Sequence, residues 1–498
     1  MKILRLLQKP PRYVVASILC SLGGFLFGMD TGIIGPVTVM PHFTKPFGEP
    51  SPTIHGLIVS SILIPAAVSS LLAGRVADTL GRPKAIAIGS IIFGIGALIE
   101  ATAVHVGMFI SGRIIAGFGE GIYLGTLVVY ICEISPAKYR GPFATAPQLL
   151  ITCGLMTGFF TCYGSAKINS TLSWRLPFIL LAIYSAVFSG MALLLPASPR
   201  WLAFHGRTRQ EVSNAWESLG VRGADQDTIP DQEEIQEERA SSSDSLKMLD
   251  VFSAEARPRF IFAVFLMGAQ QLSGIDGVLY YAPLLFKQAG ISSEGGTFLA
   301  SGVSAMVIFA VTIPATIWAD ALGRRRNVIM GGLGMALVMF IIGGLYAANA
   351  VHSYGAGRWI VIVCIYIFIV IFSFSWAVSV KVYVSEIQPQ RTRASATNIA
   401  YGGNWVTNFL VALVTPPLLA STSYGAYFLF GSCTVVTAVV CWVFMRETRG
   451  RTLTEIEAAF KMSRLIEMKD SIASVGRRIR RVNEITVVEE QLAEKRPL

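Results

Sequence analysis

The sequence predicts an all-α membrane protein in which twelve transmembrane helices form two pseudo-symmetric six-helix bundles. Of the 498 residues, 53% are hydrophobic and only 14% are charged, whereas about 25% of residues are charged in an average soluble domain. Apolar runs of about 20 residues, enough to cross about 30 Å of hydrocarbon, recur along the chain. Segments of this length satisfy their backbone in lipid only as helices, and the alternating segments of a membrane β-barrel do not occur.

The two-bundle organisation is predicted by a duplication within the chain. One motif has a glutamate, a proline three residues on and an arginine seven residues on, and it occurs twice: Glu133, Pro136 and Arg140, then Glu386, Pro389 and Arg393. A second motif, Gly74–Arg82 with Asp78, is echoed around Asp320 and Arg324. The copies lie 253 and 242 residues apart. A membrane protein built from two similar halves usually moves a solute through the seam between them.

We expect the twelve helices at residues 13–34, 55–79, 84–104, 107–131, 142–164, 175–195, 259–286, 297–319, 327–348, 357–386, 394–420 and 424–446. The first six would form an N-terminal bundle (13–195), and the last six would form a C-terminal bundle (259–446). Residues 1–12 would be a cytoplasmic N-terminus, because the first apolar run is long enough to be the first helix rather than a cleavable signal. A polar cytoplasmic connector (196–258), with short solvated helices at most, would join the bundles, and a cytoplasmic tail (447–498) would follow.

The basic residues of the short loops predict the orientation, because they collect on the cytoplasmic side. The loops after spans 2, 4, 8 and 10 contain Arg75, Arg82, Lys84, Lys138, Arg140, Arg324–Arg326, Arg391 and Arg393. The opposite loops contain little besides Lys45, Lys167 and Arg358. Both termini are therefore expected in the cytoplasm, with the protein in the plasma membrane. The outer loop after span 5 carries a glycosylation sequon at Asn169.

The remaining composition argues against other classes of protein. The net charge of +10 mostly reflects the loop bias, and nothing in the sequence suggests a nucleic-acid partner. All seven cysteines lie in or at the ends of apolar spans, which is typical of buried thiols rather than metal ligands. No nucleophile–base set or phosphate-binding loop is found. We expect no enzyme activity, metal or cofactor, and we expect a monomer in the lipid bilayer.

At this point the residues resemble the sugar porter family of the major facilitator superfamily, and most of all its fungal members. The resemblance extends from about residue 20 to 457. Its motifs occur in the family's order: Gly23–Gly32, Gly74–Arg82, Gly112–Gly121, Gln148, Pro196–Leu202, Gln270–Tyr281, Asn404–Asn408 and Glu447–Gly450. The family implies the major facilitator fold and alternating access around a central sugar site.

The resemblance also implies a set of substrate-binding residues. Five neutral amides inside apolar helices offer donors and acceptors to sugar hydroxyls: Gln148, Gln270, Gln271, Asn404 and Asn408. Three aromatic side chains would pack on the sugar ring: Phe27, Tyr280 and Trp405. The alternatives are hydrogen bonds between helices for the amides and ordinary core packing for the aromatic residues.

An acid and a base lie inside the predicted membrane spans, where ionisable groups are costly and usually functional. In the proton-coupled members that this sequence resembles, the residues at the positions of Asp30 and Arg113 form a switchable ion pair. Protonation of Asp30 would release Arg113 and couple proton entry to sugar transport. A permanent structural salt bridge is the alternative.

Further charged residues lie at the predicted cytoplasmic helix ends, where they could pair across the halves in one state and separate in the other. We expect them to form a cytoplasmic gate that closes in the outward-open form. These residues are Asp78, Arg82, Glu133, Arg140, Asp320, Arg324, Glu386, Arg393 and Glu447.

The sequence departs from the family at Ala305, at Ala377–Val378 and, above all, at Asp276 and Lys381, which add an acid and a base near the expected site. These two could form a buried pair, since neither charge alone is tolerable in a low dielectric. Lys381 could instead snorkel towards Glu386, or hold the carboxylate of a sugar acid.

These features predict proton-coupled import of a monosaccharide, a hexose or pentose. One alternative is a carrier of a polyol, a sugar acid or a quinate-type acid that uses Lys381. The other is a non-transporting sugar sensor, for which a much longer cytoplasmic tail than the one here is expected.

Overall fold

The computed structural model describes residues 11–136, 139–221, 252–253, 256–291, 293–352, 355–389, 393–450, 455–456 and 460. Within these ranges, the side chains of residues 140–142, 294, 319–322 and 393–395 are not described. The chain divides into one compact unit, Met1–Glu447, and a second unit, Thr448–Leu498. The helices discussed below all belong to the first unit. Most of the predicted tail, residues 1–10 and much of the predicted connector lie outside the described residues.

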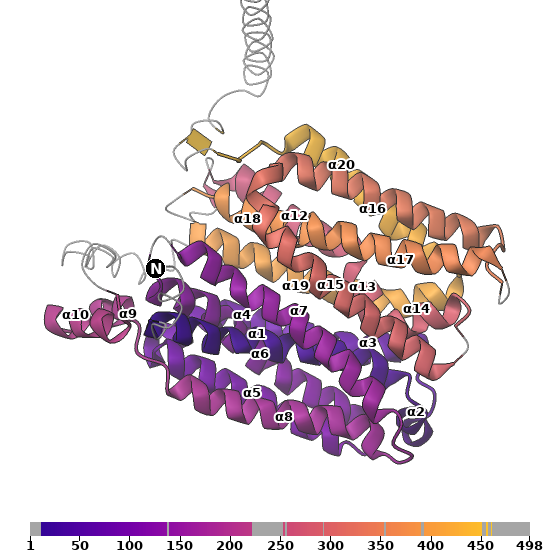
Figure 1. Ribbon diagram of the computed structural model, residues 1–498, viewed down its shortest axis with the longest axis horizontal. Helices are drawn as coiled ribbons and strands as arrows, with labels where there is room; N and C mark the ends of the chain where they lie inside the picture. The colour runs from indigo at the N-terminus through magenta and orange to yellow at the C-terminus, as the bar shows by residue number, and fades with distance from the viewer. Residues whose placement is uncertain are drawn as a thin grey trace, which may run out of the picture. The chain divides into compact units, whose positions relative to one another are not determined.

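The N-terminal half consists of six spans that follow the predicted apolar runs (Figure 1). They are α1 (Arg12–Thr38), α3 and α4 (Pro52–Ser60 and Leu63–Leu80), α5 (Arg82–Thr102), α6 (Val106–Ile134), α7 (Arg140–Ser165) and α8 (Leu172–Leu193). A short helix, α2 (Pro41–Phe47), lies in the loop after α1. Two further short helices begin the predicted connector, α9 (Pro199–Phe204) and α10 (Arg209–Ser218).

The C-terminal half repeats the arrangement with another six spans. They are α12 to α14 (Arg257–Leu272, Ile275–Tyr280 and Ala282–Gln288), α15 (Glu294–Leu322), α16 (Arg324–Ala347), α17 and α18 (Ala356–Phe374 and Trp376–Glu386), α19 (Arg393–Ser421) and α20 (Gly425–Phe444). Among the described residues, eleven helical segments are long and apolar enough to cross a membrane. The twelfth span is α19, a 29-residue helix whose apolar character is reduced by Asn404 and Asn408.

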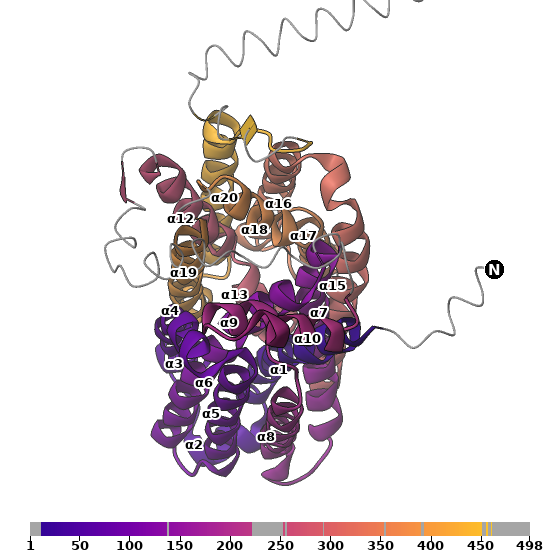
Figure 2. The same ribbon diagram turned by 90° about the vertical axis from the view of Figure 1, so that its left-hand side faces the viewer.

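The two halves meet mainly along two pairs of membrane spans (Figure 2). Helix α19 packs against α3 and α4, and helix α7 packs against α15. Polar residues of α1, α7, α12, α18 and α19 are therefore brought towards one seam, although they are far apart in the sequence. This is the arrangement that the duplicated motifs predict.

Three of the spans are interrupted, which the apolar runs alone do not indicate. Between α12 and α13, Gly274 adopts a left-handed conformation with φ of 83°, which glycine tolerates because it has no Cβ. Between α17 and α18, the carbonyl of Phe374 accepts a hydrogen bond from the Asn327 amide at 3.2 Å. The Trp376 carbonyl accepts one from Gln270 at 2.8 Å. Side chains thus satisfy backbone groups that a broken helix leaves without partners in lipid.

Close backbone contact joins α1 to α7. A Cβ added at Gly28 would collide with the backbone carbonyl of Ile151, and Gly24 faces the Pro147 carbonyl in the same way. Small residues that recur every four positions allow this approach, which matters in lipid because apolar burial alone gives helices little drive to associate.

Replacing Gly28 with Ala should therefore destabilise the protein, because the clash is with backbone that no rotamer change can move. Overpacking of a tight interface costs about 1–3 kcal/mol. Thermal unfolding in detergent should occur at a clearly lower temperature than in the wild type. The matched control is Gly190→Ala in α8, where an added Cβ has no atom within 4 Å. Equal unfolding temperatures for the two variants would contradict the packing described here.

Candidate functional site

A buried ion pair lies in the middle of the N-terminal half. Arg113 of α6 donates from Nη1 to both carboxylate oxygens of Asp30 on α1, at 2.8 and 3.0 Å. Its other terminal nitrogen, Nη2, donates to the Val59 carbonyl at 3.2 Å. Only 3% of Asp30 and 1% of Arg113 is exposed. The structure therefore brings together the acid and the base that the sequence singled out.

Two further buried carboxyl groups surround this pair, and the sequence analysis missed both. Glu100 of α5 places Oε2 3.7 Å from Arg113 Nη1. Glu120 of α6 is 0% exposed, and neither of its carboxyl oxygens has a hydrogen-bond partner among the described residues. Both could have been found by the same criterion as Asp30, since each is an ionisable residue inside an apolar span.

The amides of the C-terminal half form one connected network. Asn404 of α19 donates to the Met267 carbonyl at 2.7 Å and to Gln270 Oε1 at 3.3 Å. In turn Asn404 Oδ1 accepts from Gln271 Nε2 at 3.1 Å. Because Gln270 also bonds the Trp376 carbonyl across the break between α17 and α18, the network fixes the amides relative to both broken spans.

Part of this network remains available to a ligand. Gln271 Oε1 and Asn408 Oδ1 are buried oxygens without a hydrogen-bond partner among the described residues. A buried acceptor without a partner is costly, so both oxygens are suited to accept from the hydroxyl groups of a solute. Gln270, by contrast, is already used in bonds between helices.

Lys381 reaches across the seam to the N-terminal half. Its Nζ donates to Gln148 Oε1 on α7 at 3.0 Å. It does not snorkel to Glu386, whose carboxylate binds Arg324 at 3.0 Å. The direct ion pair expected between Lys381 and Asp276 is not formed, although the two charges are close enough to attract each other. Asp276, on α13, is half-buried like Lys381.

The three aromatic residues lie where the halves approach each other. Phe27 and Trp405 form an edge-to-face pair across the seam, with ring centroids 5.8 Å apart. Tyr280 is buried, and its backbone carbonyl packs directly against Gly35 of α1. Phe27 and Trp405 therefore contact each other across the seam, and Tyr280 contributes to a second contact between the halves.

The halves are joined at the end opposite the basic loops. Gly35 packs on the Tyr280 carbonyl and Gly56 on the Leu413 carbonyl. The rings of His55 and Tyr281 meet with centroids 5.3 Å apart. The exposed Asn169 lies in the turn between α7 and α8 at this same end.

At the basic-loop end, the ion pairs that the structure describes stay within one half. Arg82 binds Glu133 at 2.9 Å and Asp78 at 2.8 Å. In the other half Arg324 binds Glu386, and Glu447 accepts from the backbone N–H groups of Arg324 and Arg325 at 2.8 and 3.2 Å. The side chains of the other predicted gate residues lie outside the described residues: Arg140, Asp320 and Arg393.

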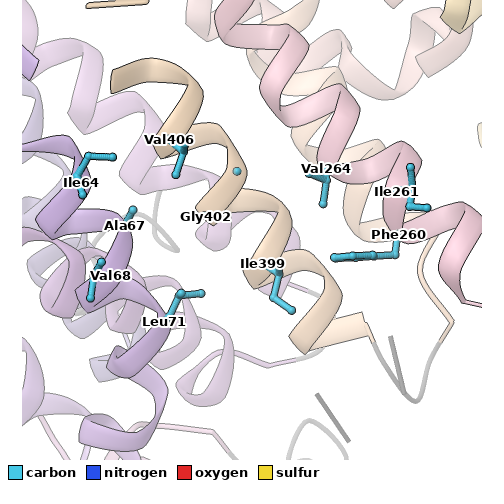
Figure 3. A pocket seen from close by; sticks show the side chains of 11 residues that line it. Ile64, Ala67, Val68, Leu71, Phe260, Ile261, Val264, Ile399, Gly402 and Val406 are labelled. Carbon is cyan, nitrogen blue, oxygen red and sulfur yellow. The ribbon is translucent and has the colours of Figure 1, made fainter. Parts of the chain in front are cut away.

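A separate groove of about 430 Å³ lies between α4, α12 and α19 (Figure 3). Its lining side chains are all apolar, so it offers no hydrogen bonds to a polar solute, and no predicted site residue contributes to it. The lining residues are Ile64, Ala67, Val68, Leu71, Phe260, Ile261, Val264, Ile399, Gly402, Gly403 and Val406.

Comparison with known proteins identifies the fold and the family. Residues 16–460 match the family model described as "Sugar (and other) transporter". The chain is 31% identical to the glucose transporter GlcP of Staphylococcus epidermidis, over 90% of this chain and 97% of that protein. It is 30% identical to the high glucose sensor RGT2 of Saccharomyces cerevisiae, over 93% of this chain and 66% of that protein.

Solved structures agree with the sequence relatives. The xylose transporter XylE from E. coli in an inward-open conformation superposes with a TM-score of 0.74 at 25% identity, covering 90% of this chain and 99% of that one. A structure described as the proton:xylose symporter XylE bound to 6-bromo-6-deoxy-D-glucose gives a TM-score of 0.73 at 27% identity and the same coverage. The chain therefore belongs to the sugar porter family of the major facilitator superfamily, whose members are transporters and not enzymes.

Proposed function

We propose that this protein imports a monosaccharide together with a proton, by alternating access, across the plasma membrane. The observation that carries the proposal is the buried Asp30–Arg113 pair in the N-terminal half, together with the amide network in the C-terminal half. The relatives described as a glucose transporter and a proton:xylose symporter support the substrate class and the coupling ion.

The ion pair supplies a means of coupling. Taking up a proton neutralises Asp30 and removes its attraction for Arg113, which is costly to leave as an unpaired buried charge. A conformation of the N-terminal half in which Arg113 finds another partner then becomes more favourable, because an unpaired buried guanidinium is costly. A ligand or proton can shift a conformational equilibrium only by binding one state better than the other, and this pair provides such a difference.

The amide network supplies a means of binding sugar. Gln271 and Asn408 carry free acceptor oxygens, and the half-buried Gln148 and Asn404 add polar atoms at the seam. Neutral amides can both donate and accept, as can sugar hydroxyls, so the two can form hydrogen bonds without burying a charge.

The arrangement of contacts supports an inward-facing state. With both termini in the cytoplasm, the contacts of Gly35 and Gly56 close the outer end. The described pairs at the inner end, such as Arg82–Glu133 and Arg324–Glu386, lie within each half and leave the halves free to separate there. In the outward-open state the same charges would pair across the halves and close the gate.

Lys381 favours a second candidate, a sugar acid as substrate. Its ammonium group points to the seam, where it donates to the neutral Gln148, while Asp276 attracts it from beyond ion-pair distance. A uronic or quinic acid could supply that carboxylate in a charge-assisted hydrogen bond.

A substrate screen in proteoliposomes tests both candidates. We expect radiolabelled hexose or pentose uptake to be driven by an inward proton gradient and abolished by an uncoupler. Unlabelled galacturonate, quinate and glycerol serve as competitors. Competition by sugars alone supports the first proposal, and competition by the acids that is lost in Lys381→Gln supports the second. Binding of sugar without any uptake would overturn both and favour a sensor.

A further inference from the structure

Arg113 lies between two carboxyl groups that come from different helices. Asp30 of α1 holds it at 2.8 Å, while Glu100 of α5 lies 3.7 Å from the same Nη1 atom. Glu100 is 1% exposed, and its Oε2 has no hydrogen-bond partner among the described residues. The second carboxyl group is thus aimed at the guanidinium but stands just beyond hydrogen-bond distance of it.

The local packing positions Glu100 for this role. The Cγ of Glu100 lies against Gly112, one residue before Arg113 in α6, where an added Cβ would come within 2.7 Å of it. Glu100 is also close to the C-terminus of α5, whose partial negative charge disfavours a carboxylate. Arg175 of α8 offsets that charge by donating to the Ala101 and Ala103 carbonyls at 2.7 and 2.9 Å.

The other ionisable groups near Arg113 are less suited to exchange with Asp30. Glu120 lies two turns along α6, about 10 Å from Arg113 by helix rise, and makes no ion pair with it among the described contacts. A carboxyl group buried without a partner is tolerated in its neutral, protonated form. The remaining groups around the pair offer Arg113 no carboxylate. They are the phenols of Tyr280 and Tyr281 near Arg113, the phenol of Tyr123 near Asp30, and the ring of His55, which lies against Tyr281.

We propose that Glu100 is the alternative counter-ion of Arg113, which receives the guanidinium when Asp30 takes up its proton. This inference rests on the proposed proton coupling and specifies how the coupling site works. The proton binds a carboxylate oxygen of Asp30, the Nη1–Asp30 ion pair breaks, and Nη1 closes the 3.7 Å gap to the Glu100 carboxylate. Arg113 therefore stays paired with a carboxylate in both states while the site takes up one proton.

A double-mutant cycle tests the exchange without relying on transport. With Asp30→Asn or Glu100→Gln alone, Arg113 keeps one carboxylate, and the unfolding temperature in detergent should fall modestly. With both changes Arg113 becomes an unpaired buried cation, and unfolding should occur about 5 °C or more below the additive expectation. The matched control combines Asp30→Asn with Glu120→Gln. Because Glu120 makes no ion pair with Arg113 among the described contacts, the changes in unfolding temperature of these two substitutions should add.

Additivity of the Asp30→Asn and Glu100→Gln changes would overturn the inference. If the double variant is not recovered as folded protein, adding Arg113→Met should restore it, because the unpaired charge is then gone. Failure of that third change to restore folding would also overturn the inference.

Transport gives a second readout. Glu100→Gln removes the negative charge that pairs with Arg113 once Asp30 is protonated. Protonation of Asp30 then becomes harder, so proton-driven uptake should reach its half-maximal rate at a pH about one unit lower. An unchanged or more alkaline midpoint contradicts the inference. If the wild type accumulates no sugar at all, the proposed function fails, while the unfolding cycle still decides whether Glu100 pairs with Arg113.

Discussion

Replacing Asp30 with Asn is expected to abolish proton-driven accumulation of sugar while leaving sugar exchange intact. The amide is close in size to the carboxylate and can still accept from Arg113, but it can neither carry the charge nor take up the proton. The ion pair between Arg113 and residue 30 is then lost permanently, as it would be each time Asp30 takes up a proton. The carrier should therefore equilibrate sugar across the membrane without concentrating it.

The measurement compares uptake driven by a pH gradient with exchange of labelled for unlabelled sugar. With one proton per sugar, a gradient of about one pH unit sustains about tenfold accumulation, and Asp30→Asn should reduce this ratio to one. The control is Glu49→Gln, the same type of change at an exposed carboxyl group. Unaltered concentrative uptake in Asp30→Asn would refute proton coupling at this residue. Loss of exchange as well would favour a permanent structural salt bridge.

The sequence predicts the fold well because a segment that crosses lipid must satisfy its own backbone hydrogen bonds. Each long apolar run must become a helix, and all twelve predicted spans are helical in the structure. The interruptions within spans 2, 7 and 10 could not be predicted from hydropathy. The break before Trp376 depends on Asn327 and Gln270 from two other helices, which satisfy its carbonyl groups.

The charged part of the site was only partly predictable. Asp30 and Arg113 were found because the resemblance points to them and because each is an ionisable residue in an apolar span. Glu100 and Glu120 meet the second criterion equally well and were overlooked. The contact of Lys381 with Gln148 depends on how two helices from different halves approach each other, and no local pattern encodes that distance.

Replacing Gln271 with Leu should raise the KM for sugar about 10- to 100-fold while uptake remains measurable at high sugar concentration. The substitution removes a free acceptor for a sugar hydroxyl and leaves Asn404 Oδ1 without the Gln271 donor. Each unsatisfied polar group in a buried site costs about 1–3 kcal/mol. Initial uptake rates over a range of sugar concentrations give the KM directly.

The control variant is Thr407→Val, which lies about one turn from Asn404 on α19. Thr407 bonds the Gly403 carbonyl of its own helix at 2.9 Å, so its loss should leave the KM unchanged. If the amides serve only to join helices, Gln271→Leu should instead lower the unfolding temperature and leave the KM as it is. A raised KM for Gln271→Leu, beside an unchanged KM for Thr407→Val, would place Gln271 in the sugar site, because losing the Asn404 contact alone weakens the fold without removing a group that bonds the solute.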